Sequence, residues 1–430
     1  MGRKTKFKQL YCYMNGVLVG ELTLQSGQLS FQYDSSWLNF PKSRPISLSM
    51  PLQTAEHKGD VVAAYFDNLL PDSSQIRQQI VNRLGAQNTS PFELLSTIAA
   101  DCVGALSLSK TPDIASQNQL KLIPLNDENI ADTLRQARTG NFGMQKDEDF
   151  RISIAGVQEK TALTYWQGQW YKPLGTTPTT HILKLPIQPY LETSVENEWF
   201  CLRFLSHLGF KVPEIAIKTF IDQKVLTITR FDRKLTDNNI VRLPQEDMCQ
   251  ALGVFSGRKY QNDGGPGITD MMGILKTSIN ALADQHTFMR SQVVYWLLAA
   301  IDGHAKNFSI FLQPQGFSLS PIYDVISVYP YLGKGNIPPK QKIKMALAVY
   351  GEKKAHYKWA EILRRHWITT AQKVDFAVDE MEMILNDLVE QVPIAIESTL
   401  AELPDGFPAN ISDSIANGIT RCLKKLNDQT

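Results

Sequence analysis

The sequence predicts an α+β protein in which a β-rich part is followed by a mainly helical part. Two observations indicate this class. Short runs of β-branched and aromatic residues, separated by turn signals, occur between Leu10 and Arg230, and apolar residues recur at helical spacing after Gln245. The chain has 430 residues, of which 43% are hydrophobic. This length suggests two to four domains at roughly 100 to 200 residues each, and the hydrophobic share excludes a mainly disordered protein.

The overall charge and the cysteines exclude several classes of protein. Lys plus Arg is 44 and Asp plus Glu is 43, so the net charge of +1 does not indicate nucleic-acid or anionic-membrane binding, although local basic patches remain open. The longest apolar run, Val293 to Ile301, is far shorter than the about 20 residues that span a membrane.

The basic N-terminus lacks the apolar core of a secretion signal. Scattered cysteines without a C-x-x-C pair favour reduced thiols and give no metal framework: Cys12, Cys102, Cys201, Cys249 and Cys422. We therefore expect a cytoplasmic protein without membrane contact.

Residues 1–110 are predicted to form a small α+β subdomain. Asn15-Gly16 and Ser26-Gly27 are typical hairpin turns, and they predict a meander of three strands. The expected strands are Leu10–Met14, Val17–Leu24 and Leu29–Tyr33. The expected helices are Asp60–Leu70, Ser73–Leu84 and a helix from Pro91 to about Ala100.

Three further parts are expected. Residues 111–150 are polar with weak apolar periodicity, which favours a linker or irregular segment. Residues 151–244 are expected to form a β-rich lobe, and residues 245–430 a helical lobe whose helix 374–392 is expected to end at Pro393. The expected elements of the β-rich lobe are the strands Thr161–Trp166, Gln169–Lys172, His181–Leu185, Ile215–Ile221 and Val225–Arg230, with a helix at about Val195–Leu208.

The most informative stretch is IDGHAKNF, residues 301–308. It follows the apolar helix expected at Val293–Ile301, so Asp302 is expected where a buried helix opens into a loop, and strands are expected at 308–312 and 322–325. Asp302, Asn307 and then Asp324 have the spacing of a kinase catalytic loop. There the first Asp accepts the proton of the substrate hydroxyl, while the Asn and the second Asp hold Mg²⁺. On spacing alone, the alternative is that Asp302 caps a turn and Asn307 satisfies loop backbone.

Lys184 lies in a strand with apolar neighbours on both sides. An exposed strand lysine is the ordinary interpretation, and the phosphate-pairing lysine of a kinase is the functional one. The functional interpretation requires a carboxylate from the next helix. Glu198 is well placed for that role, and Glu196 competes with it from a different face of the helix.

Two further segments are candidates for nucleotide contacts. The stretch from Ser153 to Thr161 contains a single glycine and fails the Gly-rich and Walker A templates, but Ala155-Gly156 followed by lysine allows close approach of backbone to phosphates. An ordinary turn is the alternative. Thr229 to Arg233 ends a strand where a kinase has its inter-lobe connection, and the alternative there is a surface Asp–Arg pair.

Taken together, these segments resemble the HipA kinases, the toxin components of bacterial HipBA type II toxin–antitoxin modules. The resemblance spans about residues 10 to 420, with the motifs in the same order. The segments that carry it are 66–72 (FDNLLPD), 101–106 (DCVGAL), 153–161 (SIAGVQEKT), 178–184 (PTTHILK), 230–233 (RFDR), 243–250 (LPQEDMCQ) and 302–308 (DGHAKNF).

The resemblance implies a serine/threonine protein kinase that uses ATP and Mg²⁺. Its implied fold is α+β and two-lobed, similar to protein and phosphoinositide kinases, with a small α+β subdomain added before the β-rich N-terminal lobe and a mainly helical C-terminal lobe. The family's catalytic Asp falls on Asp302, its metal ligands fall on Asn307 and Asp324, and the lysine-pairing carboxylate is expected at Glu198. The implied ATP contacts are Ile154, Ala155, Gly156, Val157, Gln158, Glu159, Lys160, Lys184, Thr229, Arg230, Phe231, His304, Lys306, Asn307, Tyr323 and Asp324.

The family's regulatory serine falls on Ser153, which implies autophosphorylation there. A phosphate would add about −1.5 to −2 charges inside a loop that cradles ATP phosphates, so repulsion should push the loop out and disable nucleotide binding. Thr229 departs from the family pattern, in which this hinge position is a Glu. A contact to ATP through hinge backbone survives that change, whereas one through the side chain does not.

The resemblance also implies partners. These are a dimeric helix-turn-helix antitoxin similar to HipB, operator DNA bound through that complex, and glutamyl-tRNA synthetase as the protein substrate. Basic clusters such as Lys353-Lys354 are usually solvated surface, but in such a complex they are candidates for contact with DNA phosphates.

Two other functions stay open from the sequence. One is a lipid or small-molecule kinase on the same scaffold, since these motifs do not encode acceptor recognition. The other is a catalytically silent corepressor that acts only with its antitoxin. The catalytic positions carry competent residues, which favours a toxin kinase that phosphorylates glutamyl-tRNA synthetase, is inactivated at Ser153 and co-represses its operon.

Overall fold

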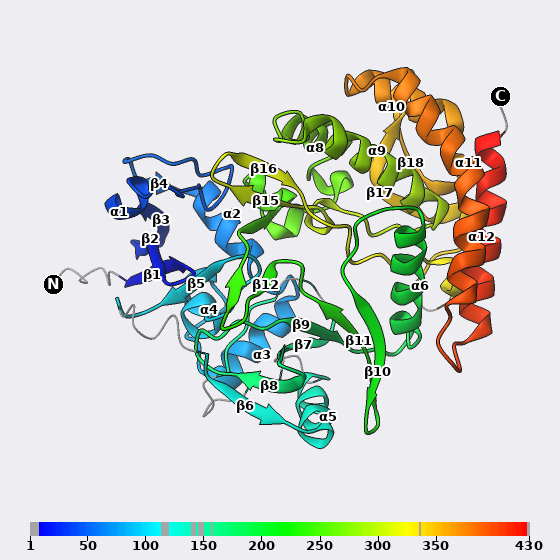
Figure 1. Cartoon of the computed structure of the whole chain (residues 1–430). Coiled ribbons are helices and arrows are strands. Elements are labelled where there is room, and N and C mark those ends of the chain that lie inside the picture. The colour runs from blue at the N-terminus through cyan, green and yellow to red at the C-terminus, as the bar shows by residue number, and fades with distance from the viewer. Residues whose placement is uncertain are drawn as a thin grey trace. The chain divides into compact units, whose positions relative to one another are not determined.

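The computed structural model describes residues 8–112, 120–138, 143–144, 150–154, 156, 158–334 and 337–427. The chain forms two compact units (Figure 1). The first comprises Met1–Leu185, Lys218–Gly257 and Ile310–Phe317, and the second comprises Pro186–Ile217, Arg258–Ser309 and Ser318–Thr430. Each unit therefore combines stretches that are far apart in the sequence. The division into four sequential parts stays a prediction.

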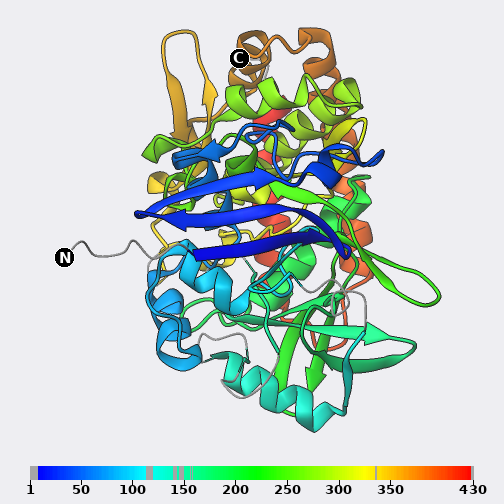
Figure 2. The same ribbon diagram turned by 90° about the vertical axis from the view of Figure 1, so that its left-hand side faces the viewer.

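The first unit contains a sheet with the strand order β4-β3-β2-β1-β5, and Figure 2 shows its blue strands β1, β2 and β3 side by side. Asn15 and Gly16 have φ angles of 48° and 81°, and Ser26 and Gly27 have 52° and 83°. Positive φ at both central residues is the mark of the expected I′-type turns, so the predicted meander is confirmed. The strands are β1 (Lys8–Met14), β2 (Val17–Gln25), β3 (Gln28–Tyr33), β4 (His57–Lys58) and β5 (Leu106–Ser109).

Helices α2 (Asp60–Asn68), α3 (Ser74–Leu84) and α4 (Pro91–Ile98) confirm the three predicted helices, and the short α1 (Ser35–Leu38) precedes them. Residues of the sheet such as Phe31 and of α2 such as Phe66 are fully buried in one apolar cluster. The strand β5 was not predicted. It pairs antiparallel with β1 and brings the end of the 101–106 segment to the edge of the sheet.

A second sheet has the order β10-β11-β9-β7-β8-β6. Its strands confirm the predicted run, and α6 (Ser194–His207) confirms the predicted helix. The strands are β6 (Leu122–Leu125), β7 (Lys160–Trp166), β8 (Gln169–Pro173), β9 (His181–Lys184), β10 (Ile215–Phe220) and β11 (Gln223–Thr229).

The expectation of an irregular segment over residues 111–150 is wrong for part of it. The structure has β6 at the edge of the second sheet, followed by α5 (Asp127–Gln136). The apolar pattern is weak because an edge strand buries little of itself and because α5 buries only a narrow stripe around Ile130 and Leu134. A capping box between Asn126 and Asn129 starts this helix.

Short strands and turns lie between the two sheets and the segments that carry the predicted site residues. Residues 322–325 were expected to be a strand, but they have no regular structure, and β16 (Gly316–Leu319) lies earlier. Asp324 has a φ of 59°, which an extended strand does not allow. The remaining elements here are β12 (Arg233–Leu235), β13 (Ile240–Arg242), β14 (Gln245–Asp247), α7 (Met248–Ala251) and β15 (Ser309–Gln313).

The second unit is mainly helical. In Figure 1, α6 lies beside α11, which packs against α12. The indoles of Trp296 and Trp359 each donate a hydrogen bond to the other residue's carbonyl oxygen, at 3.1 and 2.7 Å, in the middle of this core. The main elements are α8 (Ile268–Leu275), α9 (Ala281–Leu297), β17 (Lys344–Tyr350), β18 (Ala355–Lys358), α10 (Arg364–Lys373), α11 (Val378–Ala401) and α12 (Ala409–Asn427). Short 3₁₀ turns are η3 (Ser256–Arg258), η4 (Gln261–Asp263), η5 (Ala305–Asn307), η6 (Tyr329–Tyr331), η7 (Lys340–Lys342) and η8 (Trp359–Glu361).

Two predicted helix ends are wrong. The helix before Asp302 ends at Leu297, because Ala299 adopts a left-handed φ of 48° that stops α9 before Ile301. The helix expected to stop at Pro393 continues to Ala401. Pro393 is exposed, on the side of α11 where water can satisfy the lost backbone hydrogen bond, while the buried stripe continues through Ile396.

None of the five cysteines forms a disulfide, in agreement with the predicted reduced thiols, and all five are buried. Among the described residues, no helix combines the length and the apolar character that crossing a membrane requires.

Candidate active site

The loop after α9 presents Asp302. The backbone N–H of His304 and the side-chain Nδ2 of Asn307 both donate to the carbonyl oxygen of Asp302, each at 2.8 Å. These two bonds fix the backbone of Asp302, and its side chain stays 63% exposed. The His304 side chain, by contrast, is only 5% exposed. The loop therefore holds a carboxylate toward solvent on a rigid backbone.

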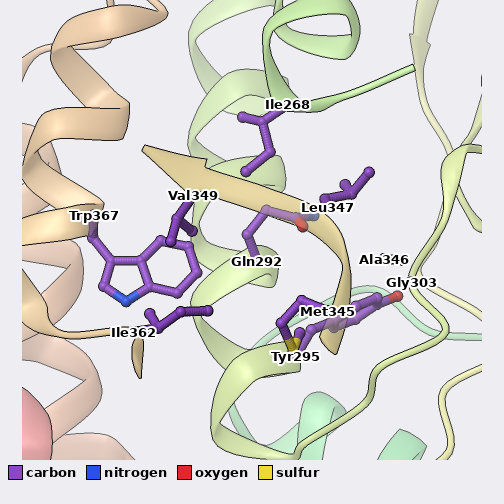
Figure 3. Close-up of a pocket in the computed structure, with 10 residues that line it drawn as sticks. All are labelled: Ile268, Gln292, Tyr295, Gly303, Met345, Ala346, Leu347, Val349, Ile362 and Trp367. Carbon is purple, nitrogen blue, oxygen red and sulfur yellow. The ribbon is translucent and has the colours of Figure 1, made fainter. Parts of the chain in front are cut away.

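Gly303 lets this loop lie directly on the core. A Cβ at this position would come 2.4 Å from Cδ2 of Tyr295, so no larger residue fits without moving the ring. Gly303 and Tyr295 border the small cavity shown in Figure 3, between α9 and β17. Apolar residues of β17, among them Met345 and Leu347, form another wall of it. The apolar core behind the loop thus fixes the position from which Asp302 projects.

The segment with Tyr323 and Asp324 is attached to the same loop. The hydroxyl of Tyr323 donates to the carbonyl oxygen of Lys306 at 2.8 Å and lies 2.5 Å from Oγ of Ser309. Burial raises the pKa of Tyr295, and the nearby Asp324 carboxylate raises it further. The left-handed φ of 59° at Asp324 is costly for a non-glycine residue, and such strain is concentrated at functional sites. The structure thus brings the 302–307 and 323–324 segments together in the second unit.

Tyr260 is a site residue that the sequence analysis missed. Its hydroxyl donates a short hydrogen bond to Oδ1 of Asp302. Its ring meets the His304 ring edge-on, with 4.9 Å between centroids and 84° between planes. No sequence signal marks this residue, because 42 positions separate it from Asp302 and their contact depends on how the chain between them folds back.

Both candidate carboxylates of α6 are buried in the second unit. Glu198 is 1% exposed and Glu196 is 3% exposed. Between them, Asn197 fixes the helix to the segment after Asp324: its Nδ2 donates to the carbonyl of Ser327, and its Oδ1 accepts from the Ser327 N–H, both at 2.8 Å. Because Lys184 belongs to the first unit, its pairing with Glu198 stays a prediction.

Ser153 is closely packed in the first unit. Ser153 is fully buried, and its Oγ donates to the carbonyl oxygen of Leu69 at 2.6 Å. Its N–H donates to the carbonyl of Asp101 at 2.9 Å. The segments 66–72 and 101–106, singled out in the sequence, therefore supply the acceptors that hold this serine. A buried serine of this kind leaves no space for a phosphate group.

Lys160 and Lys184 lie side by side in the first unit. They are paired directly across strands β7 and β9 in the antiparallel register and are each 6% exposed. Directly opposed residues project from the same face of a sheet. A Cβ at Gly156 would lie 2.7 Å from Nζ of Lys160, so the small residue lets the loop approach this ammonium group. Two adjacent cations beside the backbone of Gly156 suit a polyanionic ligand.

The other predicted loop residues take different positions. Ile154 is buried at 3% exposure, whereas Gln158 donates from Nε2 to the carbonyl of Leu185 at 2.7 Å. The carbonyl of Glu159 accepts from the N–H of Leu185 at 3.0 Å, which fastens the end of the loop to β9. Ala155 and Val157 lie outside the described residues.

Thr229, at the predicted hinge, contacts a histidine. Its Oγ1 lies 3.2 Å from Nε2 of His181, and Nδ1 of the same ring lies 2.8 Å from Oγ1 of Thr180. Burial lowers the pKa of His181 to about 4, and the positive charge of Lys218 contributes to the decrease. The ring is therefore neutral near pH 7, and it orients the side chain that replaces the glutamate of the family pattern.

The side chain of Arg230 is buried in a network of charged groups, so the Asp–Arg pair that was the alternative interpretation of this segment is not on the surface. The Nη2 of Arg230 contacts Oδ2 of Asp232 at 2.7 Å, and its Nη1 contacts Oδ2 of Asp101 at 3.4 Å. Arg233 and Arg242 each reach Oδ1 of Asp101 at 2.9 Å. The guanidinium group of Arg230 thus belongs to a structural network, which we call the Asp101 cluster: Asp101, Arg230, Asp232, Arg233 and Arg242.

The remaining predicted residues are Phe231, which is half-buried and packs edge-on against Phe311 at 5.8 Å, and the two surface lysines. Lys353 and Lys354 are exposed at the turn between β17 and β18. Contact of these lysines with DNA stays a prediction.

Comparison with known proteins identifies the family. A family model described as HipA-like C-terminal domain matches residues 152–396, and one described as HipA N-terminal domain matches residues 10–109. The chain belongs to the HipA family. The serine/threonine-protein kinase toxin HipA of Shewanella oneidensis is 26% identical over 337 residues, which are 75% of this chain and 76% of that protein. Y4mE of Sinorhizobium fredii, named as a kinase candidate, is 28% identical over 403 residues, which are 92% of this chain and 93% of that protein.

A solved structure has the same fold. A chain of the Shewanella oneidensis toxin–antitoxin complex of HipA, HipB and operator DNA matches with a TM-score of 0.80 at 22% identity, over 97% of this chain and 96% of that chain. The predicted resemblance to HipA kinases and the predicted fold class are therefore confirmed. The enzyme class, a protein serine/threonine kinase, is confirmed at the level of the family.

Proposed function

We propose that this HipA-family protein is the kinase toxin of a toxin–antitoxin module and transfers the γ-phosphoryl group of ATP to a serine or threonine hydroxyl. The observation that carries the proposal is the loop of the second unit. Asp302 projects into solvent there, while Asn307 and the 323–324 segment are bonded to the same loop. We assign Asp302 the role of accepting or orienting the proton of the incoming hydroxyl, which is worth roughly 10² to 10⁴ in rate.

The donor set fits a magnesium ion that is shared with nucleotide phosphates. Mg²⁺ prefers hard oxygen ligands and in nucleotide sites takes only one or two protein groups. Asp324 supplies a carboxylate and Asn307 an amide oxygen, because the Nδ2 of Asn307 already donates to Asp302. When bound, the ion would neutralise charge on the transferring phosphoryl group.

The first unit offers positive charge for the phosphates of ATP. Lys160 and Lys184 place two cations on one face of the sheet, and the Gly156 loop approaches them closely. We propose that these residues hold the phosphates and that backbone near Thr229 meets the adenine. Arg230 is assigned to the structural network and not to ATP, since its side chain is taken by two carboxylates.

We also propose that Ser153 is the regulatory autophosphorylation site. Its hydroxyl is fully buried against the carbonyl of Leu69, so it can accept a phosphoryl group only after the loop has left this position. Once phosphorylated, it cannot return, because the charged group would lose its hydration and face the carbonyl oxygen. Phosphorylation would thus keep the loop out and prevent ATP binding.

The partners are proposed from the relatives. The solved Shewanella complex contains HipB and operator DNA, and we propose a HipB-like antitoxin dimer and operator binding through it, with co-repression, for this chain. The exposed Lys353 and Lys354 are candidates for phosphate contacts in such a complex. Glutamyl-tRNA synthetase is the proposed substrate, on the resemblance to HipA kinases.

Mass spectrometry of the purified protein tests this function. We expect a mass increase of about 80 Da on the peptide that contains Ser153, the mass of one phosphate. Asp302→Asn should lack the phosphate, and Ser153→Ala should lack it while still transferring labelled phosphate from ATP to glutamyl-tRNA synthetase. Full activity of Asp302→Asn would contradict the catalytic assignment. DNA repression with no phosphotransfer to any protein would indicate a silent corepressor instead, and transfer only to lipids or small molecules would change the substrate class.

A further inference from the structure

The hydroxyl of Tyr260 meets the carboxylate on which the proposed chemistry depends. It donates a short hydrogen bond to Oδ1 of Asp302. Both residues belong to the second unit, and none of the assigned catalytic, metal or nucleotide roles includes Tyr260. Tyr260 therefore contacts the carboxylate that we propose accepts the proton of the acceptor hydroxyl.

The loop that carries Tyr260 is built to hold it in place. The carbonyl oxygen of Tyr260 accepts two backbone hydrogen bonds, from Asp263 and Gly265, both at 3.0 Å. A Cβ at Gly265 would lie 1.8 Å from the carbonyl oxygen of Arg258, so only glycine allows this turn. The backbone of the tyrosine is therefore fixed by its own loop.

The same loop is fastened to its surroundings at two further points. The carbonyl of Lys259 accepts from the N–H of Ala305, at 3.3 Å, in the loop that follows Asp302. On the other side, Oε1 of Gln261 accepts from the N–H of Ala348, at 2.8 Å, in β17. Tyr260 is thus positioned relative to Asp302 by backbone contacts as well as by its own hydroxyl.

The aromatic ring contributes a third constraint. It packs edge-on against the His304 ring, whose side chain is 5% exposed and whose Nε2 lies 4.0 Å from Oδ1 of Asp302. A ring held against a buried neighbour cannot swing freely, so the position of its hydroxyl is defined. Oδ1 of Asp302 consequently faces a fixed donor, although the carboxylate as a whole is 63% exposed.

We propose that Tyr260 is a positioning residue for phosphotransfer. An exposed aspartate samples several rotamers, and a fixed donor at Oδ1 selects one of them and directs Oδ2 toward the acceptor hydroxyl. Positioning of this kind matters because a misplacement of about 1 Å can cost about 100-fold in rate. The inference rests on the proposed function, since it requires Asp302 to be the residue that accepts the proton.

A second interpretation of the same contact predicts the opposite result. The hydroxyl of Tyr260 could occupy the place of the acceptor hydroxyl and block it, as an autoinhibitory contact. The geometry favours positioning, because the carbonyl and the ring of Tyr260 are each fixed by other groups and the residue is not on a loose segment. Removal of the hydroxyl separates the two interpretations: it lowers the rate if Tyr260 positions Asp302 and raises it if Tyr260 blocks the site.

The test uses the full chain with Tyr260→Phe, Asp302→Asn, the double variant and the control Tyr190→Phe, whose tyrosine is 58% exposed. Phosphotransfer is measured with the acceptor that the wild type phosphorylates, together with ATP binding and thermal unfolding. For Tyr260→Phe we expect kcat to fall by about 10-fold to 100-fold, with KM for ATP and the melting temperature unchanged. In the Asp302→Asn background, the same change should have no further effect, because the tyrosine acts through that carboxylate. Tyr190→Phe should match the wild type.

Each other outcome decides against a specific claim. An unchanged or higher kcat in Tyr260→Phe would overturn the positioning role, and so would a loss that persists in the Asp302→Asn background. Full activity of Asp302→Asn would instead show that the proposed function of this loop is wrong, whatever Tyr260 does. A wild type that phosphorylates no acceptor would overturn both.

Discussion

Asp101 and Asp302 are aspartates in opposite environments. Asp101 lies in the first unit with a side chain that is 1% exposed, and it is contacted by Arg230, Arg233 and Arg242. Asp302 lies in the second unit with a side chain that is 63% exposed, and its carboxylate has one short hydrogen bond, from Tyr260. The Asp101 carboxylate has its oxygens taken by cations and by Thr179, whereas the Asp302 carboxylate stays accessible to another molecule.

The difference shows how the same side chain stabilises the structure in one place and remains available for the proposed chemistry in another. Burial by itself would raise the pKa of Asp101, but the Arg233, Arg242 and Arg230 guanidinium groups outweigh burial and hold that pKa well below its usual range. A carboxylate fixed in this way cannot take up a proton from a substrate. A general base instead needs an oxygen atom that is accessible to the substrate and a side chain with a defined orientation. The loop around Asp302 provides both.

The largest expected effect is kinetic. Asp302→Asn should lower kcat for phosphotransfer by about 10² to 10⁴, because it removes the proposed proton acceptor while keeping the shape of the side chain. The melting temperature should not change, since the side chain is largely exposed. Steady-state rates with labelled ATP and a thermal unfolding scan check both parts. A marked loss of stability in this variant would remove the contrast with Asp101.

The next effect is on stability. Asp101→Asn should lower the free energy of unfolding by about 3 to 5 kcal/mol, because it leaves three buried guanidinium groups with Asp232 as their remaining carboxylate in the cluster. Urea unfolding at neutral pH measures this change. The matched control is Asp375→Asn, whose carboxylate is 85% exposed and pairs with Lys276. We expect the control to change stability by under about 0.5 kcal/mol, and equal effects of the two variants would contradict the structural role of the Asp101 cluster.

The smallest effect concerns pH and a third carboxylate. Glu246 is fully buried in the first unit, where its Oε1 accepts from the N–H of Leu48 at 2.8 Å. Burial raises its pKa from 4.5 to about 8. The folded protein therefore holds this proton more tightly than the unfolded chain, so the stabilising contribution is complete below about pH 4 and is lost as the pH rises through about 8.

Replacing Glu246 by Gln should remove this pH dependence. We expect the wild type to lose on the order of 2 kcal/mol more than Glu246→Gln between pH 6 and pH 9. Melting temperatures across that range measure the difference, with Glu352→Gln as the control because Glu352 is exposed. If the melting temperatures of the wild type and Glu246→Gln change with pH in the same way, Glu246 does not contribute to the pH dependence of stability. That result would contradict the raised pKa of this carboxyl group.

The sequence predicted most strands, turns and helices of the fold, because local residue patterns determine them. The turns at Asn15-Gly16 and Ser26-Gly27 require positive φ, and Gly and Asn supply it at low cost. The failures occurred where tertiary contacts outweighed the local pattern. The strand expected at 322–325 is prevented by the left-handed Asp324, and Pro393 does not end α11 because the buried stripe of that helix continues past it.

For the candidate site, sequence spacing predicted that Asp302, Asn307 and Asp324 belong together, since they lie in short segments with a characteristic order. The structure bonds these segments to one another in the second unit, while the roles of the three residues stay predictions. Sequence spacing was not sufficient for Tyr260, whose relation to Asp302 depends on how a distant loop folds back. Nor could it place Arg230, because only the packed structure shows that its guanidinium group is taken by Asp101 and Asp232.

The sequence by itself determined the family and with it the class of enzyme, because the motifs that carry the resemblance are short and follow one another in a characteristic order. Only the tertiary structure decided which charged residues are buried and which are accessible. Burial is determined by contacts between segments far apart in the chain, such as those of Asp101 with Arg230 and Arg242. Removing a charge from water is costly, so a buried charged residue needs partners of opposite charge. The role of such a residue therefore depends on these partners and not on its position in the sequence.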